Sequence, residues 1–201
     1  MKVGVIDYGM GNLKSVCNAL NFIGKEARLI TSREHFADCG NLILPGVGAF
    51  SDALSFLREK EFDREIEKAV REGRNLLGIC LGLQILFDKS YENGEFDGLS
   101  LLRGEIVKFT NARKIPHMGW NTLNIKKKSP LFENLPCAGD PAVYFVHSYH
   151  LVTKEDIVSS TTEYGGEIQV SAQKDNLYAV QFHPEKSGDV GLKILSNFVS
   201  L

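Results

Sequence analysis

Short apolar runs alternate with amphipathic stretches along the first half of the chain. Four runs have the length and composition of buried strands: Val3–Ile6, Ala27–Ile30, Asn41–Leu44 and Asn75–Ile79. Helical periodicity begins near Asn12 and near Phe62, and it ends at Gly24 and Gly73, where glycine commonly caps a helix. Repeated strand–helix units predict a parallel sheet that is covered by helices on both faces.

Further helix starts are predicted from local sequence. Thr31–Glu34 has the spacing of a capping box, which predicts a short helix after the second strand. Ser51 is expected to cap the helix that follows the third strand. After the fourth strand, Leu83, Leu86 and Phe87 begin another helical pattern.

The pattern changes between Gly98 and Gln173, where short alternating segments replace the helix-length ones. We expect antiparallel strands at Glu105–Thr110, Asn121–Ile125, Val143–Val146, Tyr149–Val152 and Ile168–Ala172. A last strand at Leu177–Phe182 and a helix from about Ser187 close the chain. The prediction is an α/β fold: a doubly wound, mostly parallel sheet with flanking helices and an appended antiparallel β layer, all in a single domain over residues 1–201.

Composition and charge exclude several classes of protein. With 201 residues, 43% of them hydrophobic, the chain can bury one sizeable core. The net charge is −2, and the basic run Lys126–Lys128 is too short for a nucleic-acid surface and is expected to be a solvated hairpin tip. We expect no membrane span, because no stretch approaches the roughly 20 apolar residues that cross a bilayer. The N-terminus opens into a strand and lacks the features of a signal peptide.

The four cysteines are scattered without the paired spacing of a zinc site. This usage favours a cytoplasmic chain with reduced thiols over a disulfide-linked scaffold. Cys17 lies on the apolar face of a helical pattern and is expected in the core, whereas Cys39 and Cys137 occupy turn-like contexts. Only Cys80 carries a chemical signal.

Cys80 lies where a strand turns into a helix, in the segment Gly78–Gln84. A residue on such a sharp turn is presented at the carboxyl edge of a sheet, and it needs small neighbours two positions before and after it. Both of these neighbours, Gly78 and Gly82, are glycine. A helix that starts at Leu81 would also direct its N-terminal N–H groups toward the sulfur, which favours the thiolate. The pattern predicts a catalytic cysteine.

A base and its orienting carboxylate are predicted near the other end of the chain. His183 and Glu185 follow an apolar strand and are two residues apart, which places both side chains on one side of an extended segment. Pro184 between them biases His183 toward extended geometry. A thiol nucleophile needs an adjacent general base, and that base needs an orienting group. Cys80, His183 and Glu185 supply one residue for each role.

A third segment is predicted to bind the oxyanion that forms during acyl transfer. Pro45, Gly46, Val47 and Gly48 come directly after a buried strand. The two glycines allow backbone N–H groups to converge on a ligand oxygen. The residue after a nucleophile usually gives another donor, and here it is Leu81.

Two weaker patterns predict no cofactor and no metal. Gly9-Met10-Gly11 resembles the start of a dinucleotide fingerprint, but Lys14 occupies the position of the third glycine, and no acidic residue ends the second strand. His147 and His150 have a helical metal-ligand spacing, yet on extended segments they would face opposite ways.

The three motifs together resemble those of the class I, triad-type glutamine amidotransferases. They are Pro45–Gly48, Gly78–Gln84 and His183–Glu185, in the expected order, and the resemblance spans essentially the whole chain. It implies that the chain hydrolyses glutamine and passes ammonia to a synthase. It also implies that Gln84, Ser148 and Tyr149 contact glutamine.

Further segments are similar to those of one branch of this family, the glutaminase subunits of imidazole glycerol phosphate synthases. They are Ile6–Leu13, Pro45–Phe50, Ile115–Asn121 and His183–Ser187. This likeness implies a role in histidine biosynthesis and a heterodimer with a (β/α)₈-barrel cyclase. It also implies that Asn12, Trp120 and Lys186 lie at the interface with that partner.

Three other readings remain open from the sequence. The triad does not identify the ammonia acceptor, so the partner could be another synthase, for example in a sugar-amination pathway. A stand-alone cysteine hydrolase or peptidase would show substantial turnover without a partner. A catalytically silent regulatory module would leave Cys80 unreactive toward an electrophilic glutamine analogue.

Overall fold

The computed structural model describes residues 2–112 and 114–201. Its strands are β1 (Lys2–Ile6), β2 (Ala27–Ile30), β3 (Cys39–Gly46), β4 (Leu76–Cys80), β5 (Lys89–Ser90), β6 (Phe96–Asp97), β7 (Glu105–Lys108), β8 (His117–Thr122), β9 (Asn124–Ile125), β10 (Ala142–His147), β11 (Tyr149–Val152), β12 (Val158–Glu163), β13 (Glu167–Lys174) and β14 (Leu177–Val180). The α-helices are α1 (Leu13–Phe22), α2 (Phe50–Glu59), α3 (Phe62–Arg71), α4 (Leu81–Ile85) and α5 (Gly188–Val199). The described residues also form the 3₁₀ helices η1 (Arg33–Asp38), η2 (Pro130–Phe132) and η3 (Pro184–Lys186).

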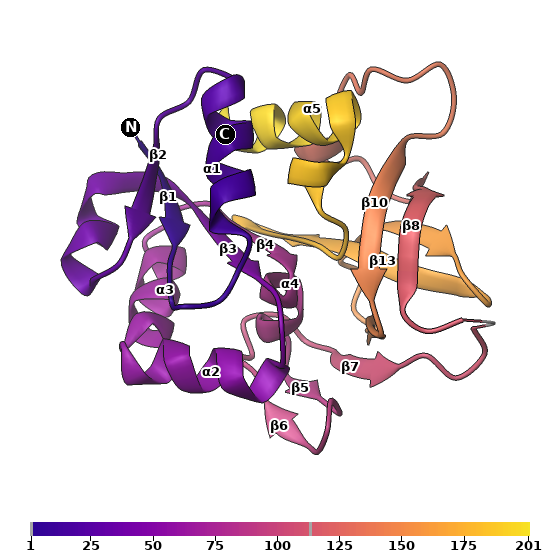
Figure 1. Cartoon of the computed structure of the whole chain (residues 1–201), viewed down its shortest axis with the longest axis horizontal. Helices are drawn as coiled ribbons and strands as arrows, with labels where there is room; N and C mark the ends of the chain where they lie inside the picture. The colour runs from indigo at the N-terminus through magenta and orange to yellow at the C-terminus, as the bar shows by residue number, and fades with distance from the viewer. Residues whose placement is uncertain (1, 113) are drawn as a thin grey trace.

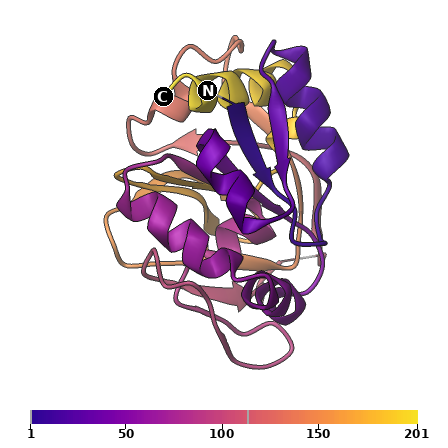
Figure 2. The ribbon, with the colours of Figure 1, turned by 90° about the vertical axis from the view of Figure 1, so that its left-hand side faces the viewer.

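The first part of the main sheet is parallel and runs in the order β2-β1-β3-β4-β14. Successive residues of a strand point to opposite faces, so Leu42 and Leu44 of β3 pack with α2 and α3, while Ile43 packs with α1 and α5. Figures 1 and 2 show the yellow α5 on one side of this sheet and α2 on the other. The predicted doubly wound α/β sheet is therefore confirmed.

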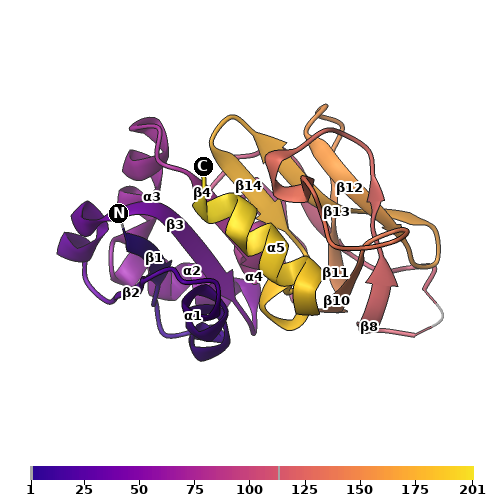
Figure 3. The same cartoon turned by 90° about the horizontal axis from the view of Figure 1, so that it is seen from above.

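The antiparallel strands extend this sheet beyond β14. β13 pairs with β14, β11 with β13, and β7 with β11, all antiparallel. β8 and β10 form a separate two-stranded antiparallel sheet. Seen from above, β12, β13 and β8 lie on the opposite side of α5 from β1 and β2 (Figure 3). The predicted β layer is thus partly a continuation of the main sheet and partly a second small sheet.

Two predicted helix caps are wrong. The segment after β2 is the 3₁₀ helix η1, whose N-cap is Ser32, and no side chain in the described part of the chain caps it. The Thr31 hydroxyl lies 3.3 Å from His35 Nδ1, so no capping box forms. Helix α2 begins at Phe50, one residue before the predicted cap Ser51. The N–H of Phe50 is instead bound by the carboxylate of Glu92 at 2.7 Å, a partner distant in sequence.

Helix α4 is shorter than the helical pattern after Cys80 predicts. The carbonyl groups that would continue it are bound from outside: Leu99 N–H donates to Ile85, and the Leu101 and Leu102 N–H groups donate to Leu86. A helix of five residues has a small macrodipole, so its N–H groups matter more than its dipole. Cys39, expected in a turn, begins β3 and is buried.

No helix in residues 2–112 and 114–201 is long and apolar enough to cross a membrane.

Candidate active site

The three predicted motifs meet at one edge of the sheet because their strands are parallel neighbours. β4 lies between β3 and β14, with Gly46 opposite Cys80 and Val180 opposite Ile79. The carboxyl ends of all three strands therefore lie side by side. The loop after β3, the turn after β4 and the segment leading to His183 consequently surround the same space.

Cys80 has the strained backbone of a nucleophile elbow. Its φ of 56° and ψ of −109° lie outside the regions that L-residues prefer. A Cβ atom on Gly78 would lie 2.7 Å from the carbonyl oxygen of Gly82, and one on Gly82 would lie 1.8 Å from that of Leu44. The turn can close this tightly only because both positions lack side chains, as the sequence predicts.

His183 is held by Glu185 through a buried hydrogen bond. Nδ1 of His183 lies 2.8 Å from Oε1 of Glu185, and the two side chains are only 2% and 1% exposed. Burial alone would lower the pKa of His183, but the neighbouring Cys80 sulfur and the Glu185 carboxylate raise it to about 10. An imidazolium beside Cys80 favours the thiolate form of the sulfur.

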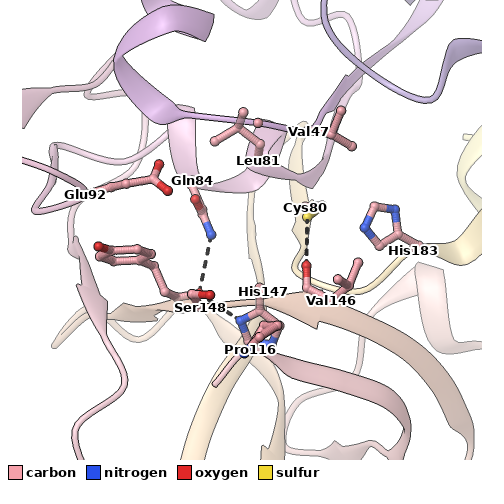
Figure 4. Close-up of a pocket in the computed structure, with 12 residues that line it drawn as sticks. Val47, Cys80, Leu81, Gln84, Glu92, Pro116, Val146, His147, Ser148 and His183 are labelled. Carbon is pink, nitrogen blue, oxygen red and sulfur yellow. Dashed lines mark hydrogen bonds between the residues drawn. The ribbon is translucent and has the colours of Figure 1, made fainter. Parts of the chain in front are cut away.

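Figure 4 shows His183 and Cys80 on the same side of the cavity, with the imidazole facing the sulfur. Among the described residues, Nε2 of His183 has no hydrogen-bond partner. The sulfur lies 4.0 Å from the carbonyl oxygen of Val146 and accepts a hydrogen bond from Nε2 of Gln181 at 3.7 Å. The free nitrogen is the atom that a leaving amine or an attacking water would contact.

The loop Pro45–Gly48 lies against the elbow. A Cβ atom on Gly46 would lie 2.6 Å from the Tyr8 hydroxyl oxygen and 2.8 Å from Cβ of Leu81. Gly48 has a φ of +95°, which favours glycine, and a Cβ atom there would lie 2.4 Å from Cε of Met10. The glycines thus let the loop pass close to Leu81, the residue that follows Cys80.

A cavity of about 400 Å³ opens beside the sulfur. Eight of the residues predicted for the site line it: Val47, Gly48, Cys80, Leu81, Gln84, Ser148, Tyr149 and His183. Gly46 and Glu185 do not line the cavity, but each lies against a residue that does: Glu185 is hydrogen-bonded to His183, and Gly46 lies beside Leu81. The volume suits a small metabolite.

Sequence reasoning missed Glu92, which lines the end of the cavity away from His183 (Figure 4). The loop that carries Glu92 has no recognisable motif, and its place depends on the cap that it gives to α2. Gln181 was also missed, although its position two residues before His183 was a usable signal. The sequence pattern marks His147 only through its metal-ligand spacing with His150.

His147 belongs to a chain of hydrogen bonds. The carbonyl group at one end of this chain decides which atom donates and which accepts in each bond. Nδ1 of His147 lies 2.8 Å from the carbonyl oxygen of Tyr149, which can only accept, so this nitrogen is the donor. Nε2 of His147 must then accept from Nδ1 of His117 at 3.0 Å, and Nε2 of His117 accepts from the Asn121 amide at 3.3 Å. Burial lowers the pKa of His117 to about 4 and that of His147 to about 3, so both are neutral.

His150 does not join this chain, because its ring stacks on Phe109 with a centroid distance of 4.9 Å. In the described part of the chain, no group of three or more His, Cys, Asp or Glu residues could hold a metal ion.

The predicted interface residues lie outside the cavity. Trp120 is 59% exposed on β8, and Met118 of the same strand is 61% exposed. Tyr144 joins Trp120 to Lys186: its ring lies 6.3 Å from the indole ring and 5.9 Å from Nζ of Lys186. Asn12 precedes α1, which contacts the 3₁₀ helix η3 that bears Lys186.

The sequence matches the family described as "Glutamine amidotransferase class-I" over residues 4–201. It is 48% identical over 197 residues to a protein from Caldanaerobacter subterraneus subsp. tengcongensis named "Imidazole glycerol phosphate synthase subunit HisH", covering 98% of this chain and 96% of that one. A protein of the same name from Aquifex aeolicus is 48% identical over 200 residues, with coverages of 98% and 96%.

Solved structures share the fold. The structure of PurLQS from Thermotoga maritima matches with a TM-score of 0.79 at 22% identity, covering 99% of this chain and 97% of that one. A structure entitled "Crystal structure of glutamine amidotransferase" matches with a TM-score of 0.77 at 23% identity, covering 100% and 98%.

Proposed function

The chain belongs to the class-I glutamine amidotransferase family, and from this premise we propose that it is the glutaminase subunit of imidazole glycerol phosphate synthase. It hydrolyses glutamine to glutamate and ammonia in histidine biosynthesis, and a separate cyclase subunit uses the ammonia. The observation that carries this proposal is the buried Cys80, His183 and Glu185 constellation beside a metabolite-sized cavity, in a chain that is 48% identical to named HisH subunits.

In the proposed reaction, the Cys80 thiolate attacks the side-chain amide carbon of glutamine. The N–H groups of Leu81, Val47 and Gly48 stabilise the oxyanion that develops on the amide oxygen. His183 protonates the departing ammonia through Nε2 and then removes a proton from the water that hydrolyses the thioester. Glu185 keeps the imidazole in the tautomer that presents Nε2 to the reaction.

The cavity also supports an orientation for the substrate. Glu92 lies at the end away from His183, so its carboxylate would attract the α-ammonium group of glutamine, while the side-chain amide extends toward Cys80 (Figure 4). Gln84, Ser148 and Tyr149 also line the cavity. A charged anchor at one end and a nucleophile at the other would select an amino acid over an isolated amide.

The proposed partner is a (β/α)₈-barrel cyclase that forms a heterodimer with this chain. Support comes from the exposed Trp120 and Met118 on β8 and from the neighbouring Lys186. Asn12 completes the proposed interface. Glutamine hydrolysis by the chain without its partner would waste glutamine, so basal activity is low. Activity rises when the liganded cyclase binds, because binding reorients the Pro45–Gly48 peptides into the oxyanion geometry.

The proposal treats residues 1–201 as one amidotransferase domain, supported by the family match over residues 4–201. It places the chain in the cytoplasm, where the free cysteines Cys17, Cys39, Cys80 and Cys137 would stay reduced.

The test is glutamate production from glutamine, measured with and without a candidate cyclase subunit and its ribonucleotide ligand. The expected result is strong dependence on both additions and loss of turnover in Cys80→Ala. Activity that ignores this cyclase would retain the glutaminase chemistry but assign another acceptor. Full turnover by Cys80→Ala in the complex would overturn the mechanism.

A further inference from the structure

Gln181 is a buried polar residue that touches the sulfur of Cys80. It follows β14 directly, its backbone N–H donates to the carbonyl oxygen of Val170 at 2.8 Å, and its side chain is fully buried. Burying an amide group is costly unless its donors and acceptors are satisfied. The partners of the Gln181 side chain are Gln84 and the sulfur, at 3.1 and 3.7 Å.

The orientation of the Gln181 amide follows from the groups around it. Nε2 of Gln84 lies 3.4 Å from the carbonyl oxygen of Tyr149 and 3.1 Å from Oε1 of Gln181. A backbone carbonyl can only accept, so Gln84 must present its NH₂ group on this side. Gln181 must then offer its oxygen to Gln84, and its own NH₂ group faces Cys80.

We propose that Gln181 is a further catalytic residue, whose amide donates a hydrogen bond to the Cys80 sulfur and favours the thiolate. This inference rests on the proposed role of Cys80 as the nucleophile. Hydrogen bonds to a charged group are stronger than those between neutral groups, and they strengthen further where water is excluded. The same bond assists hydrolysis of the thioester, in which the sulfur leaves as a thiolate.

The groups around the Cys80 sulfur can bind both its thiol form and its thiolate form. The carbonyl oxygen of Val146, at 4.0 Å, suits a neutral thiol because it can only accept. The Gln181 amide suits the thiolate because it donates. The titratable groups that face the sulfur are His183, with Glu185 behind it, and the buried Tyr8 hydroxyl near the elbow. Gln181 is thus an uncharged donor that acts beside the imidazolium.

The experiment measures the rate at which iodoacetamide alkylates Cys80 between pH 5 and pH 9. Peptide-resolved mass spectrometry separates Cys80 from Cys17, Cys39 and Cys137. The variant is Gln181→Met, which keeps the length of the side chain but removes the donor. The control is Gln169→Met, because Gln169 also makes two side-chain hydrogen bonds, to the backbone of Thr153, and lies outside the cavity.

We expect Gln181→Met to move the midpoint of alkylation to higher pH and to slow alkylation below that midpoint about tenfold, the effect of one lost hydrogen bond to a charged group. Gln169→Met should leave the profile unchanged. A Gln181→Met profile that overlays the unsubstituted one would overturn the inference and leave the proposed function standing. A Cys80 that resists alkylation in the unsubstituted protein would instead contradict the proposed function.

A second measurement needs no substitution and covers the case in which Gln181→Met fails to fold. The side-chain amide ¹⁵N–¹H resonances of Gln181 should titrate with the same midpoint as Cys80 alkylation, and they should shift when Cys80 is alkylated. Gln169 resonances should do neither. Gln181 resonances that ignore both changes would show that its amide only satisfies Gln84.

Discussion

The phenolic hydroxyl of Tyr8 donates a 3.0 Å hydrogen bond to the carbonyl oxygen of Pro45, and this bond joins the segment after β1 to the loop beside Cys80. Tyr8 is fully buried, and burial, with a further contribution from Cys80, raises its pKa well above the ordinary value. The hydroxyl therefore remains a donor at any working pH. Because the proposed oxyanion amides of Val47 and Gly48 lie just beyond Pro45, the bond fixes the base of the segment that must present them.

Replacing Tyr8 with Phe would remove this bond and keep the ring that fills the core. We expect kcat for glutamine hydrolysis by the complex to fall about tenfold with little change in KM, because the Val47 and Gly48 amides, which are proposed to act only in the transition state, would lose their alignment. Steady-state kinetics with saturating partner would measure it. Tyr178→Phe is the matched control, since that buried ring packs on Phe198, away from the cavity. Equal losses in both variants would show a general packing effect.

Glu92→Gln tests the proposed anchor for the α-ammonium group. The substitution removes the negative charge but keeps an oxygen that can accept from the Phe50 N–H, so the cap of α2 survives. We expect KM for glutamine to rise roughly ten- to a hundredfold with a smaller effect on kcat, the size of one lost charged hydrogen bond. Glu95→Gln, on the same loop but exposed, controls for general charge effects. An unchanged KM would place the ammonium group elsewhere.

The elbow was predictable because its constraints are local. The prediction of a sharp turn at Cys80, between Gly78 and Gly82, needs no tertiary information. That His183 and Glu185 lie on one side of the chain follows from strand geometry. The parallel sheet was predictable for the same kind of reason, because the local pattern of apolar residues identifies each strand and each helix that follows it.

What the sequence could not supply depends on contacts between distant segments. The predicted cap Ser51 was wrong because Glu92, brought in from another loop, binds the start of α2. The helix after Cys80 is short because residues 98–102 bind its carbonyl groups. β12 was missed, since its Ser and Thr side chains are buried through hydrogen bonds such as that of Thr162 to the Thr122 carbonyl, at 2.6 Å, rather than through an apolar pattern.

Gly82→Ala tests the close approach of α4 to β3. A Cβ atom there would lie 1.8 Å from the Leu44 carbonyl oxygen, which belongs to the backbone and has little freedom to move. We expect a loss of about 3 kcal/mol or more in the free energy of unfolding, measured by urea denaturation. Gly139→Ala is the control, because a Cβ atom at Gly139 would meet no atom of the described residues within 4 Å. Similar stability of the two variants would contradict the geometry of the elbow.

The hydrogen-bonded pair His117 and His147 predicts sensitivity to mild acid. Burial lowers their pKa values to about 4 and about 3, against about 6.5 in an unfolded chain. The unfolded state therefore binds more protons below pH 6.5, so the free energy of unfolding should fall as the pH drops from about 6.5 toward 4. Urea denaturation at several pH values above 5, where most carboxylates stay ionised, would measure this slope.

His147→Gln should reduce that slope, because one of the two protonation sites is removed. A variant that lowers stability equally at every pH would show that His147 acts only through packing. His183 works in the opposite direction: its pKa is raised to about 10, so its contribution is complete below about pH 6.5 and is lost as the pH rises through about 10.

Trp120→Ala tests the proposed partner surface. Trp120 is 59% exposed on β8. His117 of the same strand is hydrogen-bonded to His147 in the cavity wall, so contacts connect this surface to the proposed glutamine site. Exposed aromatic side chains that become buried in an interface commonly dominate its affinity. We expect the concentration of cyclase needed for half-maximal glutaminase activation to rise at least about tenfold, which corresponds to roughly 1.4 kcal/mol or more. The measurement is a titration of glutaminase activity with the liganded cyclase.

Phe22→Ala is the control: Phe22 is 79% exposed at the far end of α1 from Asn12. If both substitutions weakened activation by the cyclase equally, or if neither weakened it, the partner surface would lie away from β8.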